Sequence, residues 1–65
     1  MLTGTVSEFS HERGLGTVTG ADGGSYLFHV IEIADATRTI DVGQSVRFRP
    51  VPKFGTFEAG AIVKV

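Results

Sequence analysis

The stretch Arg-Gly-Leu-Gly-Thr-Val at positions 13–18 is the first place to look for chemistry in this sequence. A cation beside two glycines is typical of a loop that wraps a phosphate, because glycine lets backbone N–H groups approach an anion closely. The spacing argues against such a loop. The dinucleotide fingerprint requires a further glycine where this chain has Thr19, and a helix after it, whereas a glycine-rich turn follows here. The Walker pattern is absent as well. The stretch is therefore interpreted as part of a strand and not as a phosphate-binding loop.

Residues that could support catalysis or bind a metal are sparse. His11 and His29 are not at a strong ligand spacing, and the chain contains no cysteine. Glu8 and His29 can lie on one face of a sheet, but surface pairs of this kind are mostly just solvated. No serine lies in a strained nucleophile turn, and no paired carboxylates stand out. We therefore expect no catalytic residues, no metal site and no cofactor, and we interpret the chain as a binding protein rather than an enzyme.

Length and composition indicate one domain spanning residues 1–65. Hydrophobic residues make up 42% of the chain, enough for one core, and without cysteine no disulfide can reinforce it. The net charge is -1, with one arginine against four carboxylates in residues 1–33 and five cations against three carboxylates in residues 34–65. A phosphate-attracting surface should therefore involve the second half. No signal peptide or membrane span of about 20 apolar residues is apparent, so we expect a cytoplasmic protein without a membrane partner.

Short segments rich in β-branched and aromatic residues alternate with glycine-containing turns, which predicts an all-β meander or barrel. The five predicted strands cover residues 2–10, 14–19, 26–30, 44–49 and 57–65. Residues 20–25 and 53–57 are expected to form hairpin turns, and residues 31–41 one helical turn followed by a connection. Pro50 and Pro52 lack a backbone donor, so the fourth strand should end there or lie on an edge.

Alternation along these strands predicts which side chains face the core. The inward set is Val6, Val18, Phe28, Val46 and Phe48. The outward set is Glu8, Leu15, Thr17, Leu27, His29, Arg47 and Arg49. The last strand is ambiguous, because Phe57, Ala59, Ala61 and Val63 compete with Ile62 for the interior.

Several segments, in order, resemble the bacterial cold-shock domain. They read Gly-Thr-Val-Ser-Glu-Phe (4–9), Arg-Gly-Leu-Gly-Thr-Val (13–18), Asp-Gly-Gly (22–24), Tyr-Leu-Phe-His-Val (26–30), Gly-Gln-Ser-Val-Arg-Phe (43–48) and the ending from Glu58. The resemblance covers nearly the whole chain. It implies a five-stranded antiparallel OB-fold barrel that binds single-stranded RNA or DNA. It also implies that residues 13–18 are the first ribonucleoprotein motif, on the second strand, where bases stack on aromatic rings and cations follow the phosphates.

The chain departs from this family at the residues expected to contact bases. Ser7 and Glu8 stand where the family carries lysine and tryptophan, and Leu15 and Thr17 replace two phenylalanines. Leu27, Val30 and Thr37 occupy further positions that are commonly aromatic. Each stacking platform is worth roughly 1–3 kcal/mol per base, so losing several at about 1 kcal/mol each predicts binding weaker by on the order of a thousandfold.

The expected binding residues combine what remains of this surface with the last hairpin. They are Phe9, Arg13, Leu15, Thr17, Leu27, His29, Lys53 and Phe57. Arg13 and Lys53 are expected to attract phosphate, whereas His29, Phe9 and Phe57 are expected to contact bases. Phe54 either joins this site or covers one end of the barrel. The function expected from the resemblance is weak single-stranded nucleic-acid binding of low selectivity, of the RNA-chaperone or expression-regulator type.

A second hypothesis keeps the barrel and replaces the ligand by a protein. Leu15, Leu27 and Val30, flanked by Glu8 and Glu32, form a candidate protein-binding patch, which is also a candidate for weak self-association. The charge of the surface separates the two hypotheses, since nucleic-acid binding favours net positive charge around Leu15 and His29.

Overall fold

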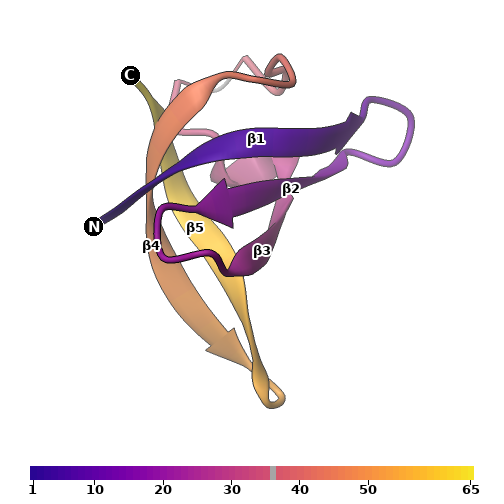
Figure 1. Ribbon diagram of the computed structural model, residues 1–65. Helices are drawn as coiled ribbons and strands as arrows, with labels where there is room; N and C mark the ends of the chain where they lie inside the picture. Colours follow the sequence, from indigo (N-terminus) through magenta and orange to yellow (C-terminus); the bar gives the residue numbers. More distant parts are fainter. Residues whose placement is uncertain (36) are drawn as a thin grey trace.

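Five strands and one short helical turn follow each other in the computed structural model, which describes residues 1–35 and 37–65. They are β1 (Leu2–Ser10), β2 (Leu15–Gly20), β3 (Ser25–His29), η1 (Val30–Glu32), β4 (Ser45–Lys53) and β5 (Thr56–Lys64). The strands form a closed barrel in the order β1-β2-β3-β5-β4, with β4 returning to β1 (Figure 1). The predicted all-β five-stranded barrel is confirmed. Its pairs are antiparallel except β3–β5, which is parallel.

The core consists of the side chains that strand alternation assigns to the interior. All five residues of the predicted inward set are buried, and Phe28 and Phe48 are the largest fully buried side chains. Tyr26, Ile33, Ile40, Ala59 and Ile62 complete the core. Because closure buries one face of every strand, a 65-residue chain obtains a continuous core without disulfides.

A register shift in β1 explains how Val6 and Glu8 face opposite sides. Residues two apart on a regular strand share a face, but the pairing with β2 shifts between Val6, opposite Val18, and Glu8, opposite Thr17. Val6 is buried and Glu8 is exposed as a result. The outward prediction for Glu8 is confirmed.

A second irregularity settles the ambiguous face of β5. Ala59 and Ile62 are both buried although they are three residues apart, and the pairing with β4 shifts between them. Ala61 there has φ 50°, and its N–H donates to Glu32 Oε1 at 3.1 Å. Glu32 in η1 thus holds the bulge that turns Ile62 inward, whereas Phe57 and Val63 remain exposed.

The prolines do not end β4, which continues to Lys53. The prediction that the strand stops near Pro50 is wrong, and the alternative, an edge position, is correct. β1 pairs with β4 only between Ser45 and Phe48, whereas β5 follows it to Lys53. Pro50 and Pro52 are two apart, so both missing N–H groups lie on the same side, away from the β5 ladder.

The connection after β3 closes the barrel. η1 is the predicted helical turn, and Ile33 after it forms a parallel bridge with Ile62. The N–H of Ala34 donates to the Ile62 carbonyl at 2.8 Å. Together with the Leu27–Glu58 pair, these contacts join the β3 side of the molecule to β5. In residues 1–35 and 37–65 no helix has the length and apolar character needed to cross a membrane.

Candidate nucleic-acid interface

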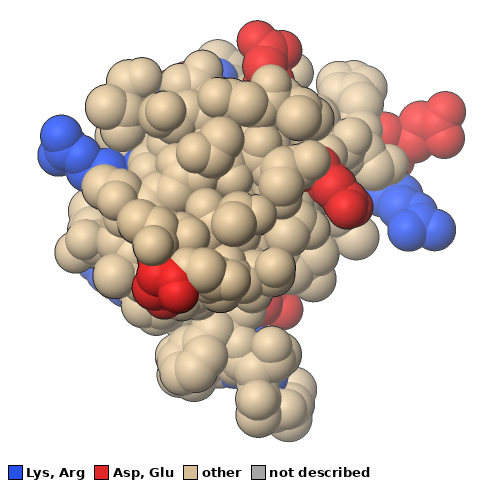
Figure 2. Space-filling model, viewed as in Figure 1, with Lys and Arg blue, Asp and Glu red and all other residues tan. Residues whose placement is uncertain are grey.

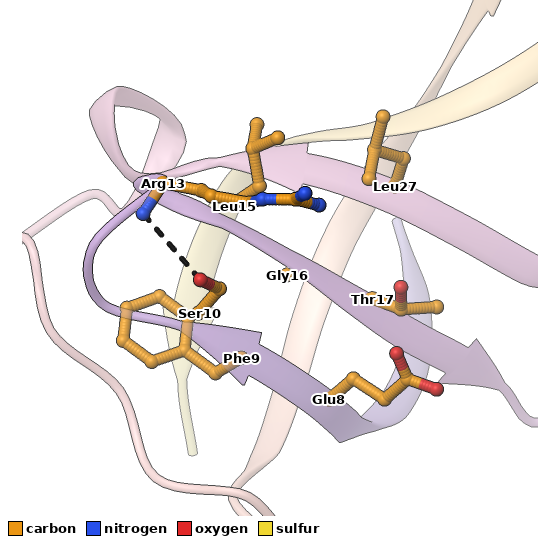
Figure 3. Close-up of a pocket in the computed structure, with 8 residues that line it drawn as sticks. All are labelled: Glu8, Phe9, Ser10, Arg13, Leu15, Gly16, Thr17 and Leu27. Carbon is orange, nitrogen blue, oxygen red and sulfur yellow. Dashed lines mark hydrogen bonds between the residues drawn. The ribbon is translucent and has the colours of Figure 1, made fainter.

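A shallow hollow of about 140 Å³ lies on the outer surface of β1, β2 and β3 (Figure 3). We call it the β2–β3 hollow; its lining residues are Glu8, Phe9, Ser10, Arg13, Leu15, Gly16, Thr17 and Leu27. Five of the eight predicted binding residues are among them. Leu27 is 41% exposed and Leu15 and Thr17 are half-buried, so this part of the predicted surface faces solvent.

The register of β2 against β3 brings these outward side chains together. Leu15 pairs with His29, and Thr17 pairs with Leu27. Gly16, between Leu15 and Thr17, lies over the core, and a Cβ there would clash with the ring of Phe28 and lie 2.8 Å from the Glu8 carbonyl. The second glycine of the Arg-Gly-Leu-Gly stretch is therefore needed for close packing of β2, not for binding a phosphate.

Phe9 forms one wall of the hollow and packs partly against the core. Its ring stacks on Phe28 with centroids 6.2 Å apart and planes 7° from parallel. His11 meets it edge-on at 6.3 Å. Since one face of the ring packs on the core, Phe9 has less surface to offer a base than a fully exposed aromatic residue.

Arg13 is positioned by the loop between β1 and β2. Its backbone N–H donates to Ser10 Oγ at 3.4 Å, and the N–H of Gly14 donates to the Ser10 carbonyl at 2.9 Å. From this loop the Arg13 side chain extends across the hollow past Leu15 toward Leu27, while Glu8 lies beside Thr17 (Figure 3). A cation and a carboxylate therefore flank one apolar floor.

Glu58 is a site residue that the sequence reading missed. Its Oε1 lies 3.8 Å from His29 Nε2, with the His29 side chain 50% exposed and the Glu58 side chain 24% exposed. The two meet because Leu27 of β3 pairs with Glu58 of β5. No local pattern indicates this contact, which joins residues about 30 positions apart through a parallel bridge.

Lys53 and Phe57 lie away from the hollow, on the β4–β5 hairpin. Both are exposed, and Phe57 is opposite Pro52. A groove of about 430 Å³ separates this hairpin from η1; we call it the hairpin groove, lined by His29, Ile31, Glu32, Val51, Lys53, Phe54, Glu58, Ala59 and Gly60. The predicted binding residues thus fall into two neighbouring groups, with His29 on β3 between them. Phe54 is fully exposed, so the alternative in which it covers a barrel end is wrong.

The position where the family commonly has an aromatic residue is used for a polar contact. Thr37 Oγ1 donates to Asp35 Oδ1 at 2.8 Å and accepts from Lys64 Nζ at 3.0 Å, and Lys64 also pairs with Asp35 at 3.1 Å. The hydrogen bond from the Thr37 backbone, with those from its hydroxyl and from Lys64, lowers the pKa of Asp35 below its ordinary 3.8. Thr37 therefore connects its loop to Lys64 of β5 by a hydrogen bond, and this position offers no aromatic ring to a base.

Charges on this surface are nearly balanced. Among the described residues that line the hollow and the groove, Arg13 and Lys53 face Glu8, Glu32 and Glu58. In Figure 2 the centre of the face is uncharged and the acidic and basic side chains lie mostly around its rim. The excess of positive charge that favours nucleic-acid binding is not found here, so long-range phosphate attraction contributes little. Arg47 and Arg49 are exposed on β4, outside both linings.

Comparison with known proteins identifies the family. No family model matches the chain. Cold shock protein 1 and cold shock protein 2 of Lactiplantibacillus plantarum (strain ATCC BAA-793 / NCIMB 8826 / WCFS1) are each 39% identical over 49 residues, 74% of this chain and 74% of each relative. Among solved structures, drosophila Unr CSD456 matches with a TM-score of 0.84 at 23% identity, covering 98% of this chain and 26% of that chain. The structural match supports the barrel fold, and the two relatives show that the chain belongs to the cold shock protein family.

Proposed function

We propose that this protein binds single-stranded RNA or DNA through the β2–β3 hollow, weakly and with little sequence selectivity. One observation carries the proposal: a member of the cold shock protein family exposes an apolar floor, Leu15 and Leu27 of β2 and β3, beside the cation Arg13. As a member of this family the chain is a binding protein, not an enzyme.

In the proposed mode, bases lie on the apolar floor and phosphates remain toward solvent. Leu15, Thr17 and Leu27 provide van der Waals contact without a π-surface, so each base gains less than the roughly 1–3 kcal/mol of an aromatic platform. His29 at the end of β3 pairs with Leu15 and offers an exposed ring next to this floor. Such contacts are sequence-tolerant, and a protein that makes them transiently keeps RNA strands from pairing or tunes expression.

Electrostatics modulate this binding without dominating it. Arg13 reaches over the hollow, whereas Glu8 places an anion near the path of the backbone. Single strands lose about 0.7 of a logarithmic unit of affinity per decade of salt for each neutralised phosphate. With Arg13 and Lys53 as the cations, we expect the logarithm of affinity to fall by only about one to two per decade of salt concentration.

The alternative function, a protein-binding barrel, has less support. Exposed Leu27 and half-buried Leu15 suit it equally well, but Val30 is half-buried and packs against the core, so the patch is smaller than expected. Family membership favours nucleic acid over a protein partner.

The test is an affinity measurement by fluorescence anisotropy with labelled oligothymidine and a mixed RNA, on two variants of opposite effect. Glu8→Trp adds a ring and removes an anion at the rim of the hollow, so affinity should rise by about tenfold. Arg13→Glu should lower affinity by about tenfold and flatten the salt dependence.

Arg47→Glu is the matched control, because it makes the same change of charge outside both linings. Equal losses in Arg13→Glu and Arg47→Glu would mean that net charge alone drives binding. No response to Glu8→Trp would exclude the β2–β3 hollow as the site.

A further inference from the structure

Phe54 occupies a backbone position that its own side chain makes unfavourable. It is the first residue of the two-residue turn between β4 and β5, with φ 46°, and Gly55 follows with φ 84°. This is the geometry of a type I′ turn, where asparagine, aspartate or glycine is favoured at the first position. The relative exposure of Phe54 is 105%, so the ring obtains no burial in return. Folding therefore gives no reason for phenylalanine at this position.

The surroundings of Phe54 form a projecting apolar tip. β4 and β5 extend beyond the other strands to this turn, and the projection is mostly uncharged at the surface (Figures 1 and 2). Phe57, three residues on, is 52% exposed and lies opposite Pro52. Two solvent-facing rings thus lie on one hairpin, whereas the β2–β3 hollow contains only the partly buried ring of Phe9.

The hairpin groove connects this tip to the proposed binding surface. His29 and Phe54 both line the groove, and Leu27, two residues before His29 on β3, lines the β2–β3 hollow. The hollow and the groove are therefore neighbours along β3, and an extended chain lying over Leu27 and His29 leads into the groove.

We propose that a single strand bound in the β2–β3 hollow continues along the hairpin groove and stacks a base on Phe54. The inference rests on the proposed function and deepens it, because it places the aromatic contacts on the β4–β5 hairpin and lengthens the bound segment. A flat ring in solvent suits a base of any sequence, since every base has a π-face.

The charged groups of the groove fit bases inside it and phosphates outside. Glu32 Oε1 already accepts the N–H of Ala61, and Glu58 faces His29. Carboxylates at the groove wall can accept hydrogen bonds from base N–H groups but repel phosphates. Lys53 lines the groove next to Phe54 and is exposed, so its ammonium can meet phosphates at the solvent edge of the groove.

The decisive variant is Phe54→Asn, which removes the ring and supplies a residue that the turn prefers. Affinities are measured by anisotropy for oligothymidines of about four and about ten nucleotides, lengths at the lower and middle part of the range that one OB fold binds. We expect unchanged affinity for the short strand and a loss of about fivefold to about a hundredfold for the long one. The urea midpoint of unfolding should rise, which a structural role of the ring would not produce.

Two controls should leave both affinities unchanged. Phe57→Ala removes an exposed ring on the other face of the hairpin, since Phe57 alternates with the groove residue Glu58 on β5. Val42→Asn changes an exposed apolar residue in another turn. Equal affinity of wild type and Phe54→Asn for the long strand would overturn the inference. If Arg13→Glu still lowered the affinity for both the short and the long strand in that case, the proposed function would stand.

Two other results would also overturn it. Absence of binding by the wild type at either length would remove the inference together with the proposed function. A concentration-dependent dimer in analytical ultracentrifugation that Phe54→Asn abolishes, with oligonucleotide binding unchanged, would assign the hairpin tip to a second copy of the chain.

Discussion

The two tight hairpin connections of this barrel use their side chains in opposite ways. Between β2 and β3, Asp22 Oδ1 accepts the N–H of Gly24 at 2.9 Å, and Oδ2 accepts the hydroxyl of the buried Tyr26 at 2.7 Å. Between β4 and β5, Phe54 adopts a left-handed conformation with its ring entirely in solvent. The first turn agrees with local turn chemistry, whereas the second departs from it.

The two turns differ in whether the fold itself accounts for their side chains. Asp22 satisfies a backbone donor and a core hydroxyl, so selection for folding alone accounts for it. Phe54 satisfies nothing within the fold, and residues that break a local preference without a structural return are candidates for a role outside the fold.

Among the substitutions that test this comparison, Gly20→Ala, beside the β2–β3 turn, should cause the largest loss of unfolding free energy. A Cβ at this position would lie 2.5 Å from Asp22 Oδ1 and 3.0 Å from Tyr26 Cε2, so the Asp22 carboxylate would have to move away from its partners. Overpacking of this kind costs about 1–3 kcal/mol of unfolding free energy, measured by urea denaturation. If Gly20→Ala had the same unfolding free energy as the wild type, the Asp22 contacts would not be important for the stability of the turn.

Gly23→Ala and Gly55→Ala should each cause a smaller loss of unfolding free energy, and the two losses should be equal. The two glycines have φ 85° and 84°, and nothing lies within 4 Å of a Cβ added at either. Only backbone strain then remains, about 1 kcal/mol each, in the same denaturation experiment. Clearly unequal losses would show that the turns differ in more than the residue beside the glycine.

The smallest effect is a pH dependence of stability to which, of these two turns, the β2–β3 turn contributes through Asp22. The N–H of Gly24, and next the hydroxyl of Tyr26, lower the pKa of Asp22 below its ordinary 3.8. The carboxylate therefore stabilises the fold above pH 3.8, and this contribution is lost as the pH falls through the lower, folded-state pKa. In thermal unfolding from about pH 6 to about pH 2, Asp22→Asn should lose less stability on acidification than the wild type.

Phe54→Asn is the control for this last measurement, because it places the same residue in the other turn without removing a carboxylate. Its pH dependence should be that of the wild type. A shallower curve for Phe54→Asn, or an unchanged one for Asp22→Asn, would contradict the assignment of the acid sensitivity to Asp22.

Much of the barrel follows from local patterns in the sequence. The bounds of the first strand, the five inward residues and the positions of the hairpin turns were predictable because alternation and glycine placement act within a few residues. The same local patterns predicted five strands, whereas the family resemblance supplied the OB-fold topology and the expected kind of ligand.

The β4 extension and the site residue Glu58 were not predictable in this way. β4 continues through Pro50 and Pro52 because β5 follows it on one side while β1 leaves it on the other. Glu58 reaches His29 because β5 runs parallel to β3 at a single pair. Both depend on which strand lies alongside, and no short window of sequence contains that information.

The five-stranded barrel, with Leu15 and Leu27 on its outer face, could be predicted from the sequence alone, since side-chain type and strand period are local properties. The bulge between Val6 and Glu8, the contact of Glu58 with His29 and the exposure of Phe54 beside a groove became visible only in the folded structure. The physical reason is that register shifts, parallel bridges and exposure are set by partner strands distant in the chain.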